Sequence, residues 1–344
     1  LDSLNHLQYY KETEWEICTP ANAAHFSAIA YYFGQMLRDS LKVPVGLICN
    51  AIGGSPTESW IDRNTLEYQF PAILKDWTRN DFIQDWVRGR AALNVKLSKE
   101  KFQRHPYEPC YLYESGIRPL EQYPVRGVIW YQGESNASEP ERYATLFPLM
   151  IEDWRRQWRN PHLAFLFVQL SSYSRHTPWK RLPEDAWRRE APGSGGGFTL
   201  LREVQAATLA LPDTGMAVSI DVGDQSDIHP QRKEEVGFRL AREARRVCYG
   251  GDALSAGPRF RGMRIQGDAA VLEFENVGSG LVSRGPVGGF VVAGADGRMH
   301  RAQAEIQEGK RIVVRSPEVR APRVVRYAWN AFPRDANVFT REGL

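Results

Sequence analysis

The stretch VRGVIWYQGESN at residues 125–136 decides the fold class. Its first seven residues form a short apolar run typical of a buried strand, and its last five are polar and contain a glycine. Three further apolar runs of this kind lie at residues 45–49, 163–170 and 216–222. Strands that are apolar throughout are typical of a mostly parallel sheet that helices cover on both faces.

Helical patterns alternate with these apolar runs. Apolar residues recur at helical spacing over residues 23–40, and helices are also predicted from about 140 to 156 and from about 233 to 247. Alternating strands and helices predict an α/β fold, in which ligands bind at the carboxyl ends of the strands. Unusual polar segments directly follow the strand-like runs, so we expect the functional site there.

The last quarter of the chain has a different pattern. After about Ala253, short β-type runs follow one another, separated by glycine, proline and Asp-Gly turns. We therefore expect two domains, an α/β domain over residues 1–252 and a C-terminal β-rich module over residues 253–344. A long loop over residues 171–200 is a candidate lid for the site.

Composition and charge exclude several classes of protein. A chain of 344 residues with 42% hydrophobic residues can form about two domains with a real core. The 44 Lys and Arg against 41 Asp and Glu give a net charge of +3 without a basic tract, so no nucleic-acid partner is expected. No apolar stretch approaches the ~18 residues of a membrane span, and no signal pattern opens the chain. We expect neither a membrane span nor a leader within these residues.

The four cysteines carry little functional information. They lie far apart and match none of the spacings of a zinc site. We expect buried thiols, although one disulfide remains compatible with an exported protein. The positions are Cys18, Cys49, Cys110 and Cys248.

Asp227 and His229 are the candidate catalytic pair. They are two residues apart in a segment expected to be a loop, so both side chains can lie on one face and the carboxylate can orient the imidazole. An oriented imidazole is the general base that acyl transfer needs. Asp221 and Asp224 are alternative orienting carboxylates. A competing interpretation is that Asp227 and His229 only cap the helix that follows.

Two glycine-containing turns are candidate binding sites for an oxyanion. Gly53 and Gly54 follow a strand-like run, and glycine N–H groups can approach a ligand closely. Gln132 places an amide donor, and Glu134 a carboxylate, at the end of another strand-like run. Either turn alone is also compatible with a purely structural role.

The motifs that the chain lacks narrow the choice further. It contains no G-x-S-x-G elbow, no P-loop, no G-x-G-x-x-G fingerprint and no H-E-x-x-H helix. Kinase, dinucleotide-binding and zinc-protease functions are therefore not expected. Glu134, Glu139 and Asp153 could supply a glycosidase pair, an interpretation that many surface acids would satisfy equally well.

Three of these segments together resemble the sialate O-acetylesterases, a branch of the SGNH hydrolase superfamily. The segments are GGSPTESW at residues 53–60, GVIWYQGESN at 127–136 and DIHP at 227–230. They occur in the family's order, and the likeness covers nearly the whole chain.

The resemblance implies a flavodoxin-like three-layer α/β/α sandwich with a mostly parallel sheet and appended β structure. It implies hydrolysis of acetyl esters on sugars or glycans by a Ser-His-Asp acyl-enzyme mechanism, with no metal or organic cofactor. In this assignment His229 is the general base and acid, Asp227 is its partner, Gly54 and Gln132 are oxyanion donors and Gly53 shapes the turn. Sialate 9-O-acetyl esters are the favoured substrates, and acetylated xylan is the alternative within the superfamily.

The nucleophile of the family lies in a Gly-Gln-Ser-Asn segment that does not occur in residues 1–344. Ser55 stands where members usually have threonine, so we do not assign it as the nucleophile. We expect the N-terminal part of the α/β domain to lie outside this chain, in a longer polypeptide or on a separate chain, and residues 1–344 alone to be inactive.

A second class of function follows from the missing serine. A non-catalytic carbohydrate-binding remnant would keep the pocket without turnover, and some of its 10 Trp and 14 Tyr residues would stack on sugar faces. We expect most of these aromatic residues to pack in the core instead. The resemblance also favours a secreted, periplasmic or lysosomal location.

Overall fold

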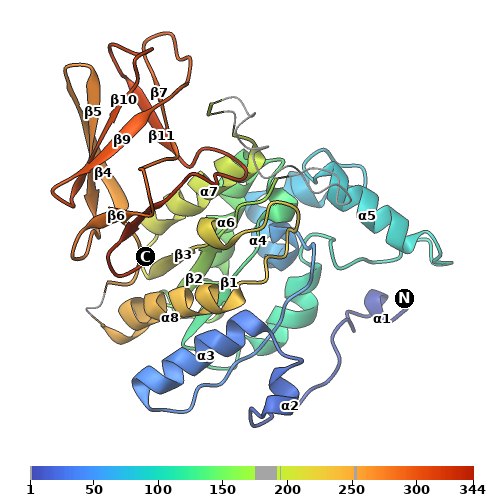
Figure 1. Cartoon of the computed structure of the whole chain (residues 1–344). Helices are drawn as coiled ribbons and strands as arrows, with labels where there is room; N and C mark the ends of the chain where they lie inside the picture. The colour runs from blue at the N-terminus through green and yellow to red at the C-terminus, as the bar shows by residue number, and fades with distance from the viewer. Residues whose placement is uncertain (1, 175–191, 194, 252–253) are drawn as a thin grey trace. The chain divides into compact units, whose positions relative to one another are not determined.

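The computed structural model describes residues 2–174, 192–193, 195–251 and 254–344. The chain forms two compact units, which are described separately below (Figure 1). Unit 1 comprises residues 1–168 and 200–215, and unit 2 comprises residues 169–199 and 216–344. The linear boundary expected at residue 253 stays a prediction.

A three-stranded sheet carries the predicted α/β character of the chain. Its strands are β1 (Gly127–Trp130), β2 (Ala164–Gln169) and β3 (Thr214–Val218), in the order β1-β2-β3. β1 and β2 are parallel, and β2 is buried over nearly its whole length. These strands confirm the three runs predicted at 125–131, 163–170 and 216–222. The end of the last run forms a short 3-10 helix, η8 (Ile220–Val222).

The strand predicted at residues 45–49 is wrong. In the described chain these residues belong to no strand, and Ile48 remains 44% exposed. A strand is stabilised by backbone hydrogen bonds to a neighbouring strand. This apolar run has no such neighbour, so it stays irregular.

The first predicted helix begins later than its pattern suggests. Residues 20–23 form a separate turn, α2 (Pro20–Ala23), and the main helix is α3 (Ala28–Leu41). The hydroxyl of Ser27 accepts a hydrogen bond from the Ala30 N–H at 3.3 Å, which caps α3 at this point. Lys42 then adopts a left-handed conformation, with φ 58°, and ends the helix.

Unit 1 has an aromatic core around β1. Trp130 lies beside Trp60, Trp154, Phe147 and Phe165, with ring centroids 5.7 to 6.5 Å apart. Two of these partners, Phe147 and Trp154, come from the predicted helix α6 (Pro140–Gln157), which is confirmed. The expectation that aromatic residues pack in the core holds for this cluster.

The other elements that begin or lie in unit 1 are short helices and turns that had no clear sequence pattern. They are α1 (Asp2–Asn5), η1 (Thr57–Trp60), α4 (Arg63–Gln69), η2 (Pro71–Leu74), α5 (Asp85–Val95), η3 (Tyr113–Ile117), η4 (Arg118–Leu120), η5 (Glu134–Asn136) and η7 (Thr208–Ala210). A further helix, α7 (Gly197–Ala207), runs across the division between the units.

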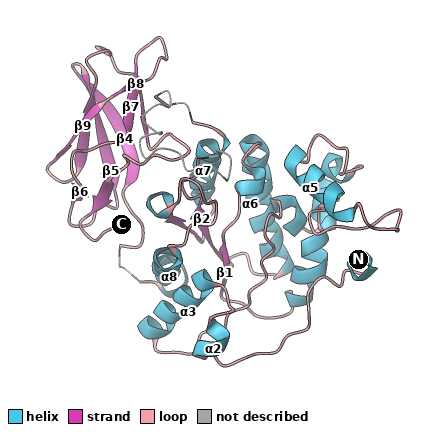
Figure 2. Cartoon of the chain, turned by 45° about the vertical axis from the view of Figure 1, so that its right-hand side comes forward, coloured by secondary structure: helices cyan, strands magenta, loops and turns pink. Residues whose placement is uncertain are grey.

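Unit 2 contains helix α8 (Lys233–Tyr249) and the C-terminal strands, which Figure 2 shows in magenta. The helix confirms the prediction at 233–247. The β-type runs predicted after residue 253 are also confirmed as antiparallel strands, in the orders β4-β5-β10-β9, β11-β7-β8 and β12-β6. Their bounds are β4 (Arg259–Gln266), β5 (Ala269–Glu275), β6 (Leu281–Ser283), β7 (Phe290–Ala293), β8 (His300–Arg301), β9 (Gln303–Gln307), β10 (Arg311–Arg315), β11 (Val324–Tyr327) and β12 (Val338–Thr340).

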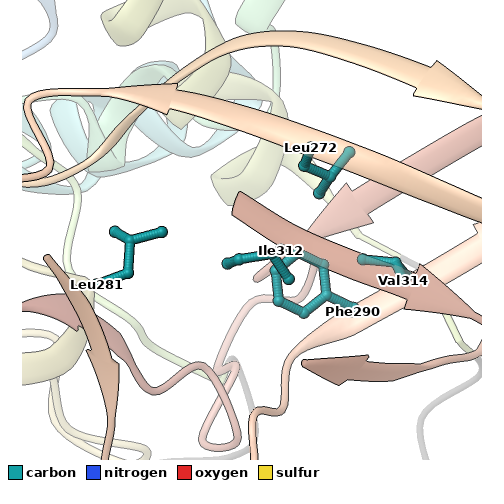
Figure 3. Close-up of a cluster of buried hydrophobic side chains, with 5 residues drawn as sticks. All are labelled: Leu272, Leu281, Phe290, Ile312 and Val314. Atoms are coloured by element: carbon teal, nitrogen blue, oxygen red, sulfur yellow. The ribbon is translucent and has the colours of Figure 1, made fainter. Parts of the chain in front are cut away.

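The C-terminal sheets share a core of buried apolar side chains. Figure 3 shows its members, each at most 4% exposed, which are Leu272, Leu281, Phe290, Ile312 and Val314. They come from β5, β6, β7 and β10, so strands of different sheets bury their side chains against one another. The chain is thus a mixed α/β protein with a small parallel sheet and C-terminal antiparallel sheets.

Three further expectations concern the lid, the cysteines and the membrane. The predicted lid lies largely outside the described residues, which omit 175–191 and 194. All four cysteines are free, but only Cys110 is fully buried, so the expectation of buried thiols fails for exposed Cys18 and Cys49. Among the described helices, none combines the length and hydrophobicity that crossing a bilayer requires.

Candidate functional site

The turn at Gly53 and Gly54 is exposed and precedes η1 in unit 1. Gly54 has φ +75°, and a Cβ at this position would lie 2.3 Å from the Tyr107 hydroxyl and 2.9 Å from Trp86 Cη2. A side chain there would be strained in conformation and in space. Nothing lies within 4 Å of the corresponding position on Gly53. The turn therefore requires glycine at Gly54. The resemblance had implied that Gly53 shapes the turn.

The Gln132 side chain links this turn to the end of β1 by hydrogen bonds. Its Nε2 donates to the Ser55 carbonyl at 3.1 Å and to Asn136 Oδ1 at 2.7 Å. Its Oε1 accepts from the Thr57 hydroxyl at 2.7 Å. A primary amide has two N–H bonds, and both are used here. Gln132 thus joins two turns in this structure, and its role as an oxyanion donor stays a prediction.

Thr57, Glu58, Gln132 and Asn136 together form a buried hydrogen-bonded cluster, called the polar hub below. Asn136 Oδ1 accepts from the Thr57 N–H at 3.0 Å, and Asn136 Nδ2 donates to Glu58 Oε2 at 3.0 Å. Thr57, Glu58 and Asn136 are fully buried. The hub connects segments more than 70 residues apart in sequence and holds the Gly54 turn against the β1 end.

Glu58 is the titratable member of the hub. Burial raises the pKa of its carboxyl to about 7, although the hydrogen bond from Asn136 and the charge of Arg142 act in the opposite direction. The negative charge of Glu139 raises the pKa further. Among the described atoms, Glu58 Oε1 is buried without a hydrogen-bond partner. The hub therefore contains a carboxyl group that changes charge near neutral pH.

Glu134 begins η5, the turn that follows Gly133, and is half-buried. Gly133 has φ 151°, in the range that favours glycine. The next residue, Ser135, donates its hydroxyl hydrogen to the Gly54 carbonyl at 2.9 Å. The structure therefore brings Gly53, Gly54, Gln132 and Glu134 into two joined turns of unit 1.

Asp227 and His229 lie in unit 2, in the loop between η8 and α8. The His229 side chain is 83% exposed, and its Nδ1 lies 3.8 Å from Asp227 Oδ1. That distance is longer than a hydrogen bond. Asp227 Oδ1 instead accepts a hydrogen bond from the backbone N–H of His229 at 2.8 Å. The carboxylate and the imidazole are therefore neighbours, with the ring open to solvent.

The helix-capping interpretation of this pair is wrong. The residue at the N-cap of α8 is Arg232, and within the described chain no side chain forms a capping hydrogen bond there. Asp227 and His229 precede the helix by several residues, so their side chains are free of that structural role.

The two alternative carboxylates are engaged elsewhere. Asp221 forms a two-pronged ion pair with Arg239 on α8, at 2.6 and 2.8 Å. Burial raises the pKa of Asp221, but the hydrogen bonds and charge of Arg239 outweigh this effect and lower it overall. Asp224 accepts from the N–H groups of Ser226 and Asp227 at 2.8 and 3.0 Å. Asp221 thus anchors the loop to the helix and Asp224 shapes it, which favours Asp227 as the partner of the imidazole.

The glycosidase interpretation gains no support. Asp153 is buried and accepts from the Asp62 N–H at 2.8 Å and from the Thr65 hydroxyl at 2.7 Å, while Glu139 pairs with Arg142. Both acids are therefore occupied in structural contacts. In the part of the chain that the structure describes, no three His, Cys, Asp or Glu side chains gather as a metal site would require.

Part of the chain, which includes several of the candidate site residues, matches a known family. Residues 82–245 match the model of a family described as carbohydrate esterase, sialic acid-specific acetylesterase. Over these residues the chain resembles the sialic acid-specific acetylesterases, which are carbohydrate esterases. The matched region includes Gln132, Glu134, Asp227 and His229, and the Gly54 turn lies before it.

Individual members of this family extend the likeness. The chain is 32% identical to sialate O-acetylesterase of Mus musculus over 266 residues, which are 70% of this chain and 47% of that protein. Its identity to the Homo sapiens enzyme of the same name is 30% over 257 residues, 70% of this chain and 43% of that protein. The chain thus spans about half the length of the curated relatives it matches.

A solved structure has a similar fold. It is a carbohydrate acetylesterase from Xanthomonas citri, with 39% sequence identity and a TM-score of 0.79. The likeness covers 96% of this chain and 66% of that chain. The chain therefore has a carbohydrate esterase fold.

Sequence reasoning missed the polar hub and the aromatic residues that border the Gly54 turn. Thr57 and Glu58 belong to the GGSPTESW motif, and Asn136 ends the GVIWYQGESN motif. Their polar character inside otherwise buried segments is the signal that could have identified them. Trp86 and Tyr107 lie outside all three motifs, and nothing in the local sequence relates them to Gly54.

Proposed function

We propose that this chain functions in a carbohydrate O-acetylesterase that hydrolyses O-acetyl esters of sugars, with sialate 9-O-acetyl esters as favoured substrates. The observation that carries the proposal is the Asp227–His229 pair, in which an exposed imidazole has a carboxylate oxygen 3.8 Å from its Nδ1. The family match over residues 82–245 and the acetylesterase names of the relatives support the same chemistry. The flavodoxin-like three-layer arrangement and a secreted, periplasmic or lysosomal location are part of this proposal.

The proposed reaction proceeds through an acyl-enzyme. A serine hydroxyl attacks the acetyl carbonyl carbon while His229 accepts its proton, and the same imidazole then protonates the departing sugar oxygen. Water next attacks the acyl-enzyme with His229 again as the base, which releases acetate and restores the serine. Asp227 fixes the tautomer of the ring, which requires the 3.8 Å separation to shorten to about 2.8 Å.

The oxyanion of the tetrahedral intermediate needs N–H donors. Gly54 supports this role because its turn is exposed and its N–H donates no hydrogen bond in the described chain. The polar hub fixes the position of that N–H in advance. For Gln132 to act as a second donor, one of its N–H bonds must turn from the Ser55 carbonyl to the substrate.

The attacking serine is proposed to come from outside residues 1–344, so that these residues alone are inactive. The sequence has no Gly-Gln-Ser-Asn segment, and the serines nearest the Gly54 turn are already bonded. Ser55 Oγ donates to the Ile52 carbonyl at 2.8 Å and accepts from Trp60 Nε1 at 2.9 Å. Ser135 Oγ donates to the Gly54 carbonyl.

The test is a His229→Ala variant of the full-length protein, with acetate release measured from 9-O-acetyl sialic acid and from acetylated xylan. We expect the loss of the general base to lower kcat by at least about 10³-fold. His162→Ala is a matched control, because His162 forms an exposed His-Asp pair, with Asp213 at 2.8 Å, outside the proposed site. Undiminished acetate release by His229→Ala would refute the assignment.

The substrate panel separates the alternatives. Faster release from acetylated xylan would identify an acetylxylan esterase of the same superfamily. Binding of the sugars without any acetate release by the wild-type protein would instead support a non-catalytic carbohydrate-binding remnant.

A further inference from the structure

Helix α5 exposes a large aromatic side chain beside the Gly54 turn. Val87 and Ala91 of this helix are buried, whereas Trp86 is 46% exposed. An exposed tryptophan leaves apolar surface in water, which costs free energy unless a ligand covers it. Its ring stacks on Tyr107, with centroids 5.9 Å apart and planes inclined by 26°.

The Trp86–Tyr107 pair is in contact with the proposed oxyanion turn. The space that a Cβ on Gly54 would occupy lies 2.9 Å from Trp86 Cη2 and 2.3 Å from the Tyr107 hydroxyl. The same hydroxyl donates to the Gly53 carbonyl at 2.9 Å. A ligand group bound at the Gly54 N–H therefore lies within reach of the indole.

Tyr107 is held rigidly behind the indole. Its backbone N–H donates to His105 Nδ1 at 3.0 Å, and the two rings meet edge to face at 4.7 Å. Burial, and to a smaller extent the charge of Arg90, lowers the pKa of His105 to about 4. His105 is therefore neutral at physiological pH and keeps Nδ1 as an acceptor. A rigid aromatic pair presents its surface to a ligand with little loss of side-chain entropy.

We propose that Trp86 is a specificity-determining residue, whose indole packs against the pyranose ring of the sugar that carries the acetyl ester. The proposal rests on the esterase function proposed above. The C–H groups on one face of a pyranose form an apolar surface that matches an aromatic ring, and Trp offers the largest such ring. An acetyl group at Gly54 places the attached sugar beside α5, where the exposed indole excludes water from that apolar face.

The experiment compares two substrates with and without a sugar ring, using the full-length protein. One is an acetylated pyranoside, and the other is ethyl acetate, whose alcohol has no ring that could stack on Trp86. For Trp86→Ala we expect kcat/KM on the acetylated pyranoside to fall about tenfold, equivalent to about 1.4 kcal/mol, mainly through KM. On ethyl acetate kcat/KM should stay within about twofold, and Trp86→Phe should restore most of the loss.

Tyr68→Ala is the matched control, since Tyr68 is an 85% exposed aromatic residue of α4 outside the proposed site. It should leave both substrates unchanged. An equal loss on both substrates in Trp86→Ala would overturn the proposal, because the indole would then support the turn rather than the sugar. Unchanged kinetics on the pyranoside would overturn it as well.

Binding of the deacetylated pyranoside, followed by saturation-transfer NMR, separates this proposal from the esterase function. Stacking needs no hydrolysis, so the saturation transfer seen with the wild-type protein should fall in Trp86→Ala even if no acetate is released. Equal transfer in both proteins would overturn the role of Trp86 and leave the esterase assignment unaffected.

Discussion

Asn136 donates a hydrogen bond to Glu58 at 3.0 Å, and both side chains are completely buried beneath the two turns of the candidate site. The bond joins the β1 end to η1 across 78 residues of sequence. A buried carboxyl is accommodated most easily when it is protonated, because burial disfavours the charged form. The stability of this part of the site is therefore coupled to pH.

The pH dependence of unfolding tests this coupling. The pKa of Glu58 is raised from 4.5 to about 7, so the folded protein holds a proton that the unfolded chain releases. The contribution of Glu58 to stability is complete below pH 4.5 and is lost as pH rises to about 7. The free energy of unfolding falls over this range by roughly 3 kcal/mol at most. Glu58→Gln should remove this loss, as urea unfolding at pH 5 and pH 8 would measure. Identical pH dependence in both proteins would contradict the assigned pKa.

Two adjacent glycines form a matched pair for a second prediction. Gly54→Ala adds a methyl group at φ +75°, 2.3 Å from the Tyr107 hydroxyl, so we expect a loss of stability of about 1–3 kcal/mol and a large loss of esterase activity. Gly53→Ala meets no atom within 4 Å and should change the stability by less than about 0.5 kcal/mol. Thermal unfolding and acetate release would measure both effects. Equal effects of the two substitutions would show that the turn tolerates a side chain.

Two of the aspartates near His229 lead to a third prediction, which separates catalysis from stability. Asp227→Asn should lower kcat by about 10²–10⁴-fold through loss of the imidazole tautomer, with little change in Tm, because the Asp227 side chain is half-exposed. Asp221→Asn should lower Tm, because it breaks the partly buried pair with Arg239. Since the pKa of Asp221 is lowered, its stabilising effect is present at neutral pH and is lost as pH falls.

Acetate release and thermal unfolding at pH 7 and at acidic pH would compare these two variants. A loss of Tm in Asp227→Asn combined with a loss of kcat in Asp221→Asn would exchange the roles of the two carboxylates.

The sheet shows how far an apolar pattern predicts a strand. The runs at 125–131, 163–170 and 216–222 are strands in the structure, whereas the equally apolar run at 45–49 is not. A run of apolar residues indicates burial, but a strand also needs a partner with which to share backbone hydrogen bonds. That partner is a property of the tertiary structure, so local sequence could not separate the fourth run from the other three.

The candidate site was predictable to a similar degree. The glycine turns and the Asp-x-His segment could be identified locally, because each depends on a few neighbouring residues. The hydrogen bonds of Gln132 to Thr57 and Ser55 could not, since their partners are 75 and 77 residues away. Trp86 was not identified, because α5 has only a weak amphipathic pattern and its place beside Gly54 depends on the folded chain.

Strand β4 lies at one edge of the four-stranded sheet and is exposed along nearly its whole length. An open edge offers unpaired backbone groups on which another molecule could add a strand. Arg259, Arg261 and Arg264 lie on β4, and the first and last of them pair with Glu275 and Glu273 of the neighbouring strand β5. Charged side chains on an edge strand oppose the addition of a further strand, so these arginines protect the C-terminal sheets against self-association into fibrils.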